Sequence, residues 1–220
     1  MYAPIFVSAT NTGVGKTTLS LEIARLCKAR GIKTLLAKPI ETGINTTEQT
    51  SDAELFFQEN LQVEAHLNLE NISFYRYVLG ASPFVAMRFE PHITIDFKEI
   101  KRKLDALQER CDLLIVEGVG GLLTPLDHKN KIVDLCTFLK MRPLIINADR
   151  LGMLNDLLLN QEYLNTHKIS HHMLINVRDK RAYTQICKPY IDYLNTALKT
   201  PILEFPEQSA RLLDAILVPC

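Results

Sequence analysis

The stretch TNTGVGKTT at residues 10–18 most constrains how this chain can fold. It follows an apolar run at residues 5–7 and opens a segment with helical apolar spacing, so it stands where a strand turns into a helix. Its two glycines let the backbone turn tightly, and a helix starting near Lys16 directs free N–H groups and a positive dipole end at the turn. The sequence therefore predicts a phosphate cradle, in which Lys16 reaches the outer phosphates and the Thr17 hydroxyl holds Mg²⁺.

The strict motif for such a loop, G-x-x-x-x-G-K-[ST], fails at its first glycine, because that position is Thr10. The second half, G-x-G-K-T-T, is intact. A Gly-Lys-Thr turn also occurs in ordinary loops, but the strand before it and the helix after it favour nucleotide binding. The residues expected to contact the nucleotide in this loop are Gly13, Val14, Gly15, Lys16, Thr17 and Thr18.

Composition narrows the class of partner. The chain has 220 residues, 47% of them hydrophobic, which is enough for one well-packed domain covering residues 1–220. Its 25 Lys and Arg balance its 25 Asp and Glu, which argues against nucleic acid or an anionic membrane as partner. The five cysteines form no C-x-x-C pair, and the chain shows neither a signal peptide nor a membrane-span pattern, so we expect a cytoplasmic protein.

Strand-like and helix-like segments alternate along the chain. This alternation predicts an α/β fold of the P-loop NTPase type, with a doubly wound, mainly parallel sheet and helices on both faces. A single helix is expected over 183–198, and the irregular stretch 61–91 resembles a lid-sized excursion from the sheet. The expected buried strands after the first span residues 33–38, 113–116, 143–148, 173–177 and 202–205.

Three polar residues at or near strand ends are candidates for chemistry. Lys38 ends the second strand, where the ligand crevice of an open α/β sheet lies, although such a lysine can equally be solvated. Ser51 or Asp52 is expected to cap a helix through Phe57, and capping is the commoner role of an aspartate at a helix start. Glu117 ends a buried apolar strand, the Walker B position, where Mg²⁺ on Thr17 would give the carboxylate a partner; a surface glutamate is the alternative.

Two other chemistries find little support. The six histidines show no metal-ligand spacing, so surface or hydrogen-bonded core positions explain them better. There is no G-x-S-x-G motif, which argues against a serine hydrolase.

Four motifs in order resemble the dethiobiotin synthetases of biotin biosynthesis. They are T-x-T-x-V-G-K-T at 10–17, K-P-x-x-[ST]-G at 38–43, the Ser-Asp pair at 51–52 and V-E-G-x-G-G at 116–121. The first and third also occur in many P-loop proteins, whereas the second and the ordered set of four are specific to this family. The resemblance covers nearly the whole chain.

This resemblance implies an ATP-dependent cyclo-ligase. Family members carboxylate 7,8-diaminononanoate with CO2, phosphorylate the resulting carbamate with ATP, and close the cyclic urea to give dethiobiotin, ADP and phosphate. Carried over by position, Lys16 and Lys38 are the catalytic cations, and Thr17, Asp52 and Glu117 hold Mg²⁺ directly or through water. Such chemistry needs fixed positive charge, because carbamate and γ-phosphate are both anions.

The family pattern also implies the remaining contacts. Beyond the phosphate loop, the nucleotide would meet Asp52, Glu117, Gly118, Val119, Gly120, Asn176, Val177 and Pro206. The diamine substrate would meet Thr12, Thr42, Ser82, Pro83, Gly121, Leu151, Gly152 and Asn155. Within L-G-x-x-N at 151–155, Asn155 would reach the substrate of a second subunit, which implies a C2 homodimer; capping of a helix start is its simpler role.

Three departures and one rival class qualify the resemblance. Ala9 replaces a glycine of the family pattern, which should matter little where the backbone is extended. Gly13 stands where many family members have an acidic residue, and the segment from Pro206 is short and divergent, which leaves the choice among nucleoside triphosphates open. A ParA- or MinD-like switch ATPase, acting through protein partners, shares the G-x-G-K-T-T ending. Those switches carry a second lysine early in the loop, where this chain has Asn11, so the ligase is the leading prediction.

Overall fold

A six-stranded parallel sheet with the order β2-β5-β1-β6-β7-β8 forms the centre of the computed structural model, which describes residues 1–44 and 50–219. Each neighbouring pair in this sheet is parallel, which confirms the predicted sheet type. The polar, threonine-rich composition of residues 44–51 predicts a loop, and part of this stretch lies outside the described residues. The strands are β1 (Ile5–Ala9), β2 (Thr34–Ala37), β5 (Leu113–Glu117), β6 (Arg142–Ala148), β7 (His172–Asn176) and β8 (Leu203–Phe205).

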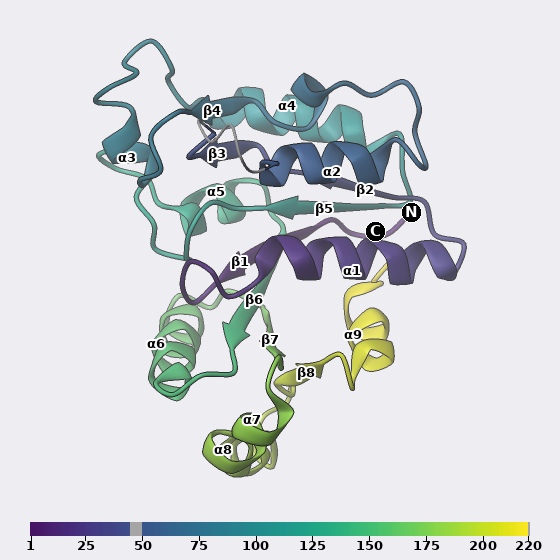
Figure 1. The fold of residues 1–220 in the computed structure, drawn as a ribbon, viewed down its shortest axis with the longest axis vertical. Coiled ribbons are helices and arrows are strands. Elements are labelled where there is room, and N and C mark those ends of the chain that lie inside the picture. Colours follow the sequence, from purple (N-terminus) through teal and green to yellow (C-terminus); the bar gives the residue numbers. More distant parts are fainter. Residues whose placement is uncertain (45–49, 220) are drawn as a thin grey trace.

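Helices cover both faces of the sheet. In Figure 1, α6 lies to the left and α9 to the right of the strands between them, while α1 runs along β1 and β5. This arrangement confirms the doubly wound architecture expected from the alternating pattern. The longer helices are α1 (Lys16–Ala29), α2 (Asp52–Asn60), α4 (Phe97–Gln108), α5 (Ile132–Phe138), α6 (Met153–Thr166), α7 (Lys180–Ile186), α8 (Lys188–Asn195) and α9 (Ser209–Ile216).

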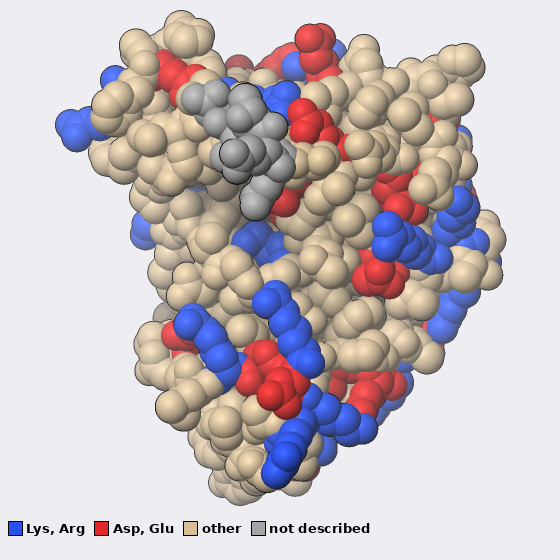
Figure 2. All heavy atoms as spheres, viewed as in Figure 1, with Lys and Arg blue, Asp and Glu red and all other residues tan. Residues whose placement is uncertain are grey.

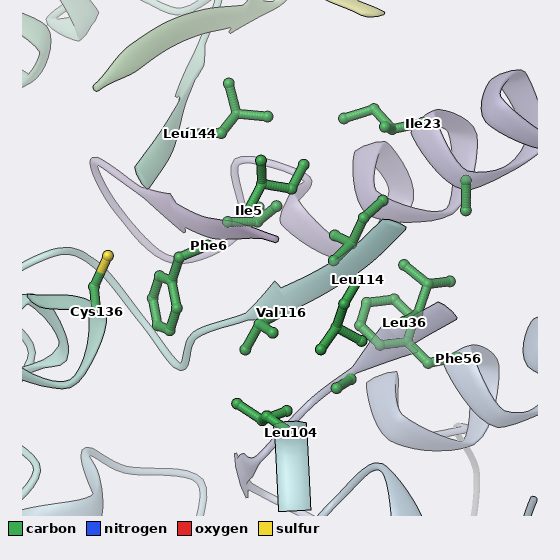
Figure 3. Packing of buried hydrophobic residues seen from close by; sticks show 14 of the residues in the cluster. Ile5, Phe6, Ile23, Leu36, Phe56, Leu104, Leu114, Val116, Cys136 and Leu144 are labelled. Atoms are coloured by element: carbon green, nitrogen blue, oxygen red, sulfur yellow. The ribbon is translucent and has the colours of Figure 1, made fainter. Parts of the chain in front are cut away.

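The strands form the core because they are apolar on both sides. β1, β2 and β5 are buried along their whole length, as expected for a parallel sheet covered by helices. Figure 3 shows Phe6 and Val116 of neighbouring strands packed among side chains from the surrounding helices, including Ile23 and Leu104. Each such fully buried side chain contributes roughly 1.5–3 kcal/mol relative to exposure, which holds the strand ends, and the polar residues on them, in place.

The prediction of a single continuous helix over 183–198 is wrong. The structure has two helices, α7 and α8, with Cys187 between them at φ −119°. The cause is Pro189, which has no N–H to donate and whose ring would collide with the carbonyl four residues earlier. The proline is tolerated near the start of α8, where that N–H would be unsatisfied in any case.

A second, two-stranded sheet lies inside the segment expected to be irregular. β4 (Tyr75–Tyr77) pairs in parallel with β3 (Ile40–Thr42), and the short helices η1 (Leu69–Asn71) and α3 (Pro83–Ala86) flank it. Three-residue strands show little periodicity: the sequence pattern missed β3 and β4, and it also missed α5, although it predicted the equally short β8. The pairing brings residues 78–82 beside the chain that follows β2, next to the carboxyl edge of the main sheet.

The surface agrees with the balanced charge of the sequence. Figure 2 shows Lys and Arg beside Asp and Glu on the face it presents. Among the described residues, no helix combines the length and apolar character that crossing a bilayer requires. The chain ends at 1 and 219 lie near each other, joined by a bridge between Tyr2 and Pro219.

Candidate active site

A cavity of about 780 Å³ lies at the carboxyl edge of the sheet, within the range of small-molecule sites. The phosphate loop forms one wall, the residues after β2 and β5 form others, and residues 80–82 lie across from them. Ligands of open α/β sheets bind at this edge. The residues in the lining that carry polar side chains are Thr12, Lys16, Thr17, Thr18, Lys38, Glu41, Thr42, Asp52, Ser82, Thr124 and Arg178.

The phosphate loop has the backbone that its glycines predict. Gly13 and Gly15 have positive φ angles of 74° and 96°, and α1 begins directly after Gly15. No side chain caps the start of α1, so its first amides face the cavity without an internal acceptor. At Gly15 a side chain is also excluded by space, because a Cβ would lie 2.5 Å from the side chains of Asn176 and Arg178. The result is an anion cradle.

Lys16 and Lys38 both line this one cavity. Lys16 lies in the first turn of α1, and burial lowers its pKa, an effect that the nearby Glu117 opposes. Lys38 follows β2 and is almost wholly buried; burial alone would lower its pKa, but the charges of Glu117 and Asp52 outweigh that and raise it. Lys38 is therefore a fixed cation, and the alternative of a solvated strand-end lysine is wrong.

Glu117 is the acceptor at the centre of the site. Its carboxylate is fully buried and accepts hydrogen bonds from Thr17 Oγ1 (3.0 Å), Ser20 Oγ (3.0 Å) and Lys38 Nζ (2.5 Å). A buried carboxylate is stable only with such partners. The structure thus excludes the interpretation of Glu117 as a surface residue at a strand end.

Asp52 is not the cap of its helix. Ser51 caps α2, in a capping box with Glu54, which leaves the Asp52 side chain free. Asp52 Oδ2 lies 3.2 Å from Lys38 Nζ. Burial would raise the pKa of Asp52, but Lys38 and a hydrogen bond from Thr17 hold it below its usual value, so Asp52 stays ionised.

The oxygens around Lys38 are of the kind that hold Mg²⁺. Thr17, Asp52 and Glu117 offer one hydroxyl and two carboxylates, and Mg²⁺ in nucleotide sites commonly takes one or two carboxylates together with phosphates and water. The residues present therefore fit this ion. Within residues 1–44 and 50–219, no group of three or more His, Cys, Asp or Glu side chains forms a separate metal cluster.

The glycine-rich segment after β5 divides into two roles. Val119 and Gly120 line the cavity. Gly118 and Gly121 do not: a Cβ on Gly118 would lie 2.9 Å from the Phe6 ring, and one on Gly121 would lie 3.2 Å from the Ala9 carbonyl. These two glycines let the segment pack on β1, and Gly118 also accepts a hydrogen bond from Lys38 through its carbonyl.

The expected substrate contacts Thr12, Thr42, Ser82 and Pro83 are partly brought together. Thr12, Thr42 and Ser82 line the cavity, although they come from three separate parts of the chain. Pro83 is buried, lies outside the lining and begins α3. Its fixed φ suits a first helical position, so it orients Ser82.

The expected trans-acting segment lies outside the cavity. Leu151, Gly152 and Asn155 are exposed, and they are not among the residues that line the site. Gly152 occupies the N-cap of α6 in a left-handed conformation, without a side-chain cap. The alternative role of Asn155 as the helix cap is therefore wrong.

The last three expected nucleotide contacts, Asn176, Val177 and Pro206, lie at or just after the ends of β7 and β8. Asn176 ends β7, is buried and donates a hydrogen bond from Nδ2 to the Val14 carbonyl at 2.9 Å. Val177 follows it, and Pro206 is exposed after β8. None of these lines the cavity directly, and Val14 is itself buried in the core.

Sequence reasoning missed Arg178. Its Nη2 donates to the Gly13 carbonyl at 3.2 Å, and its side chain lines the cavity over the phosphate loop. Asp149 Oδ2 accepts from the amides of Arg178 (2.5 Å) and Asp179 (2.6 Å) and so holds this segment. The available signal was its place directly after the predicted strand at 173–177. Ser20, which donates to Glu117, was also missed.

The parallel sheet, the glycine loop at its carboxyl edge and the buried lysine in the first turn of α1 define a P-loop nucleotide-binding protein of the α/β class. Solved structures share this fold. The MinC:MinD cell division complex of Aquifex aeolicus matches with a TM-score of 0.56 and 14% identity, over 97% of this chain and 88% of that one. A ParA family ATPase from Chlorobium tepidum matches with a TM-score of 0.54 and 12% identity, over 99% and 91%.

Sequence relatives define the family more narrowly. The family described as an AAA domain matches residues 3–203. An ATP-dependent dethiobiotin synthetase BioD of Helicobacter pylori is 41% identical over 95% of this chain and 97% of its own. That of Wolinella succinogenes is 35% identical over 97% and 99%. The chain belongs to the dethiobiotin synthetase family, which confirms the resemblance found in its motifs.

Proposed function

We propose that this chain is an ATP-dependent ligase that makes dethiobiotin from 7,8-diaminononanoate, CO2 and ATP. The observation that carries the proposal is the convergence of two buried lysines, from α1 and from the end of β2, on one cavity with the carboxylates of Asp52 and Glu117. Family membership supplies the reaction, and this geometry supplies the charge that the reaction needs.

The chemistry joins two anions. An amine of the substrate bonds to CO2 and loses a proton, which gives a carbamate. A carbamate oxygen then attacks the γ-phosphorus of ATP, and ADP leaves. The second amine attacks the carbonyl carbon of this mixed anhydride, and phosphate leaves as the ring closes. No protein nucleophile is needed, so the protein acts by positioning and by electrostatic stabilisation.

The described residues can supply both the positioning and the electrostatic stabilisation. The free amides of the loop and Lys16 bind the β- and γ-phosphates, while Lys38 faces them from the end of β2. Lys38 cannot swing away easily, because Glu117, Asp52 and the Gly118 carbonyl hold its ammonium group. Mg²⁺, when held by Thr17, Asp52 and Glu117, would neutralise further phosphate charge.

The proposal includes a homodimer in which Asn155 acts in trans. Its support is that Asn155 lies on α6 outside its own cavity, beside side chains of Leu151 and Leu159 that are 81% and 63% exposed. Exposed leucines of this kind are common at subunit contacts.

Mixing Lys38→Ala subunits with Asn155→Ala subunits tests this homodimer. The mixture should regain part of the activity that each variant lacks alone, and no regain would exclude the arrangement.

ADP release tests the ligase proposal directly. The purified chain is given Mg-ATP with diaminononanoate, with bicarbonate, with both or with neither. ADP should form at the full rate only with both, and dethiobiotin should form in equal amount. Equal ADP release in all four mixtures would contradict the ligase. The same assay with GTP or CTP in place of ATP would measure the preference among nucleoside triphosphates. The reaction consumes ATP, which suits the expected cytoplasmic location.

A switch ATPase is the second candidate, because the solved structures of similar fold include MinD and ParA proteins. That likeness concerns the fold alone. Asn11 occupies the position where such switches carry their additional lysine. ATP hydrolysis that ignores the diamine and rises only with a protein partner would favour the switch over the ligase.

A further inference from the structure

A second cavity, of about 470 Å³, lies at the amino edge of the sheet, opposite the active site. It is bounded by the starts of β1 and β6, the ends of α5 and α6, and the segment after α9. Lys140, Arg142 and Lys168 line it, and its described lining contains neither Asp nor Glu. Within residues 1–44 and 50–219, none of these three cations forms an ion pair.

Two of these three cations, both lysines, have an unfavourable backbone conformation. Lys140 and Lys168, at φ 56° and 55°, are the non-glycine residues with positive φ in the described chain. Each follows the C-cap of a helix, α5 or α6, in a Schellman motif: the amide of Lys168 donates to Asn165 and that of Ile169 to Leu164, and the end of α5 repeats the pattern.

At the end of α1, the same motif has a glycine in the left-handed position. There the left-handed residue is Gly31, whose amide donates to the Lys28 carbonyl. Helix α1 also meets its negative dipole end with a lysine in the last turn, Lys28, at no conformational cost. Offsetting the dipole therefore does not require lysine in the left-handed position. At α5 and α6 that position directs lysines to the rim of the cavity, and strain of this kind marks functional sites.

Among residues 1–44 and 50–219, the third cation also has no carboxylate partner. Arg142 Nη1 lies 3.3 Å from His172 Nε2, and only 8% of His172 is exposed. Burial, then the charges of Arg142 and His171, lower the pKa of His172 to about 4, so the imidazole is neutral near pH 7. The described residues therefore leave positive charge at this edge that a ligand can neutralise.

Much of the cavity lining is apolar. Ile5 and Ile216, which are buried, line it together with Met141, Ile169 and Val218. An apolar lining beside cations suits a molecule with a hydrocarbon body and one carboxylate, whereas a compact inorganic anion would leave the apolar side chains in contact with water. We propose that this cavity binds a small organic carboxylate with an apolar body, its carboxylate held by Lys140, Arg142 and Lys168. The site is separate from the ligase cavity and does not rest on the proposed function.

Titration calorimetry with 4-phenylbutyrate tests the site. The carboxylate should bind, while its uncharged amide and inorganic phosphate should bind at least about tenfold more weakly, since each lacks half of the recognition. The double variant Lys140→Gly/Lys168→Gly should bind about tenfold more weakly or not at all. Glycine suits both backbone positions, so the variant should melt no lower than the parent, and a folding defect cannot explain the loss.

Lys98→Gln serves as the matched control, because Lys98 is an exposed lysine on α4 that lines neither cavity. It should leave binding unchanged. Absence of carboxylate binding at millimolar concentration, equal binding of the amide, or equal binding by the double variant would each overturn the proposal. Phosphate binding as tight as the carboxylate would overturn the assigned ligand class.

Discussion

The two edges of the same sheet treat positive charge in opposite ways. At the carboxyl edge, Lys38 lies between the carboxylates of Glu117 and Asp52, which fix its position and keep it charged. At the amino edge, Arg142 faces the neutral imidazole of His172, and Lys140 and Lys168 line a cavity whose described lining holds no carboxylate. Paired cations suit a site that must hold geometry during a reaction, whereas unpaired ones suit a site whose counter-charge arrives with a ligand.

The largest effect should come from Lys38→Ala at the paired edge. Turnover should fall about 10³-fold, because the variant removes a fixed cation from the meeting point of carbamate and phosphate, while nucleotide binding persists through the loop. Coupled ADP assays and nucleotide titration measure the two separately. Lys28→Ala, on the exposed side of α1, is the control. Unchanged turnover in Lys38→Ala would refute the assigned role.

Glu117→Gln should lower turnover about 10²-fold and raise the Mg²⁺ concentration needed for half activity. The amide keeps the size of the side chain but loses the charge that Lys38 and the metal need. Ser20→Ala removes one hydrogen bond to the same carboxylate and should have a much smaller effect. An Mg²⁺ titration identical to that of the parent would reject Glu117 as a ligand.

At the unpaired edge, His172 should make stability depend on pH. Its pKa is depressed from 6.5 in the unfolded chain to about 4 in the fold, by burial first and then by Arg142 and His171. The folded state therefore binds fewer protons, and stability falls as pH drops from about 6.5 to about 4, by at most about 3 kcal/mol.

Denaturant unfolding at pH 7 and pH 4.5 measures this loss. His172→Gln should lose less stability than the parent between the two pH values, while His66→Gln, at an exposed position, should behave like the parent. A loss of the same size in His172→Gln would show that other groups cause it.

Arg178→Ala should raise the KM for ATP about tenfold and change kcat less than twofold, because the guanidinium lies over the phosphate loop rather than between the reacting groups. Arg181→Ala, in the exposed part of α7, is the matched control. A loss of kcat at unchanged KM would instead place Arg178 in the transition state.

The smallest effect concerns the helix ends. Lys140→Gly should stabilise the fold by about 0.5–1 kcal/mol, since relief of the left-handed strain exceeds the entropy cost of glycine. Gly31→Ala, in the same motif on α1, should destabilise by about 1 kcal/mol, because its left-handed φ disfavours a side chain although the space around it is open. Melting curves of both variants measure the difference. Equal effects would remove the conformational argument for the amino-edge site.

Much of the fold followed from patterns that local physics controls. Continuous apolar runs predicted the strands of the main sheet, because a parallel strand covered on both faces needs apolar residues throughout. Pro189 shows where prediction from local patterns fails. The helical pattern around it suggested one helix, whereas the structure has two, α7 and α8. Strands β3 and β4 were not predicted, because three residues show little periodicity and their pairing depends on contacts 35 residues apart; the equally short β8 was predicted from its place in the strand-helix alternation.

By itself, the sequence determined the phosphate loop, the lysine that follows it and the family, since a glycine-lysine-threonine turn and short ordered motifs act through neighbouring residues. Only the tertiary structure decided that Ser51 caps α2 and leaves Asp52 free, and that Lys38 meets Glu117, 79 positions away. It alone brought Arg178 over the loop and gathered three cations at the opposite edge. Such contacts depend on which strands lie side by side, and the packing of the whole sheet sets that order.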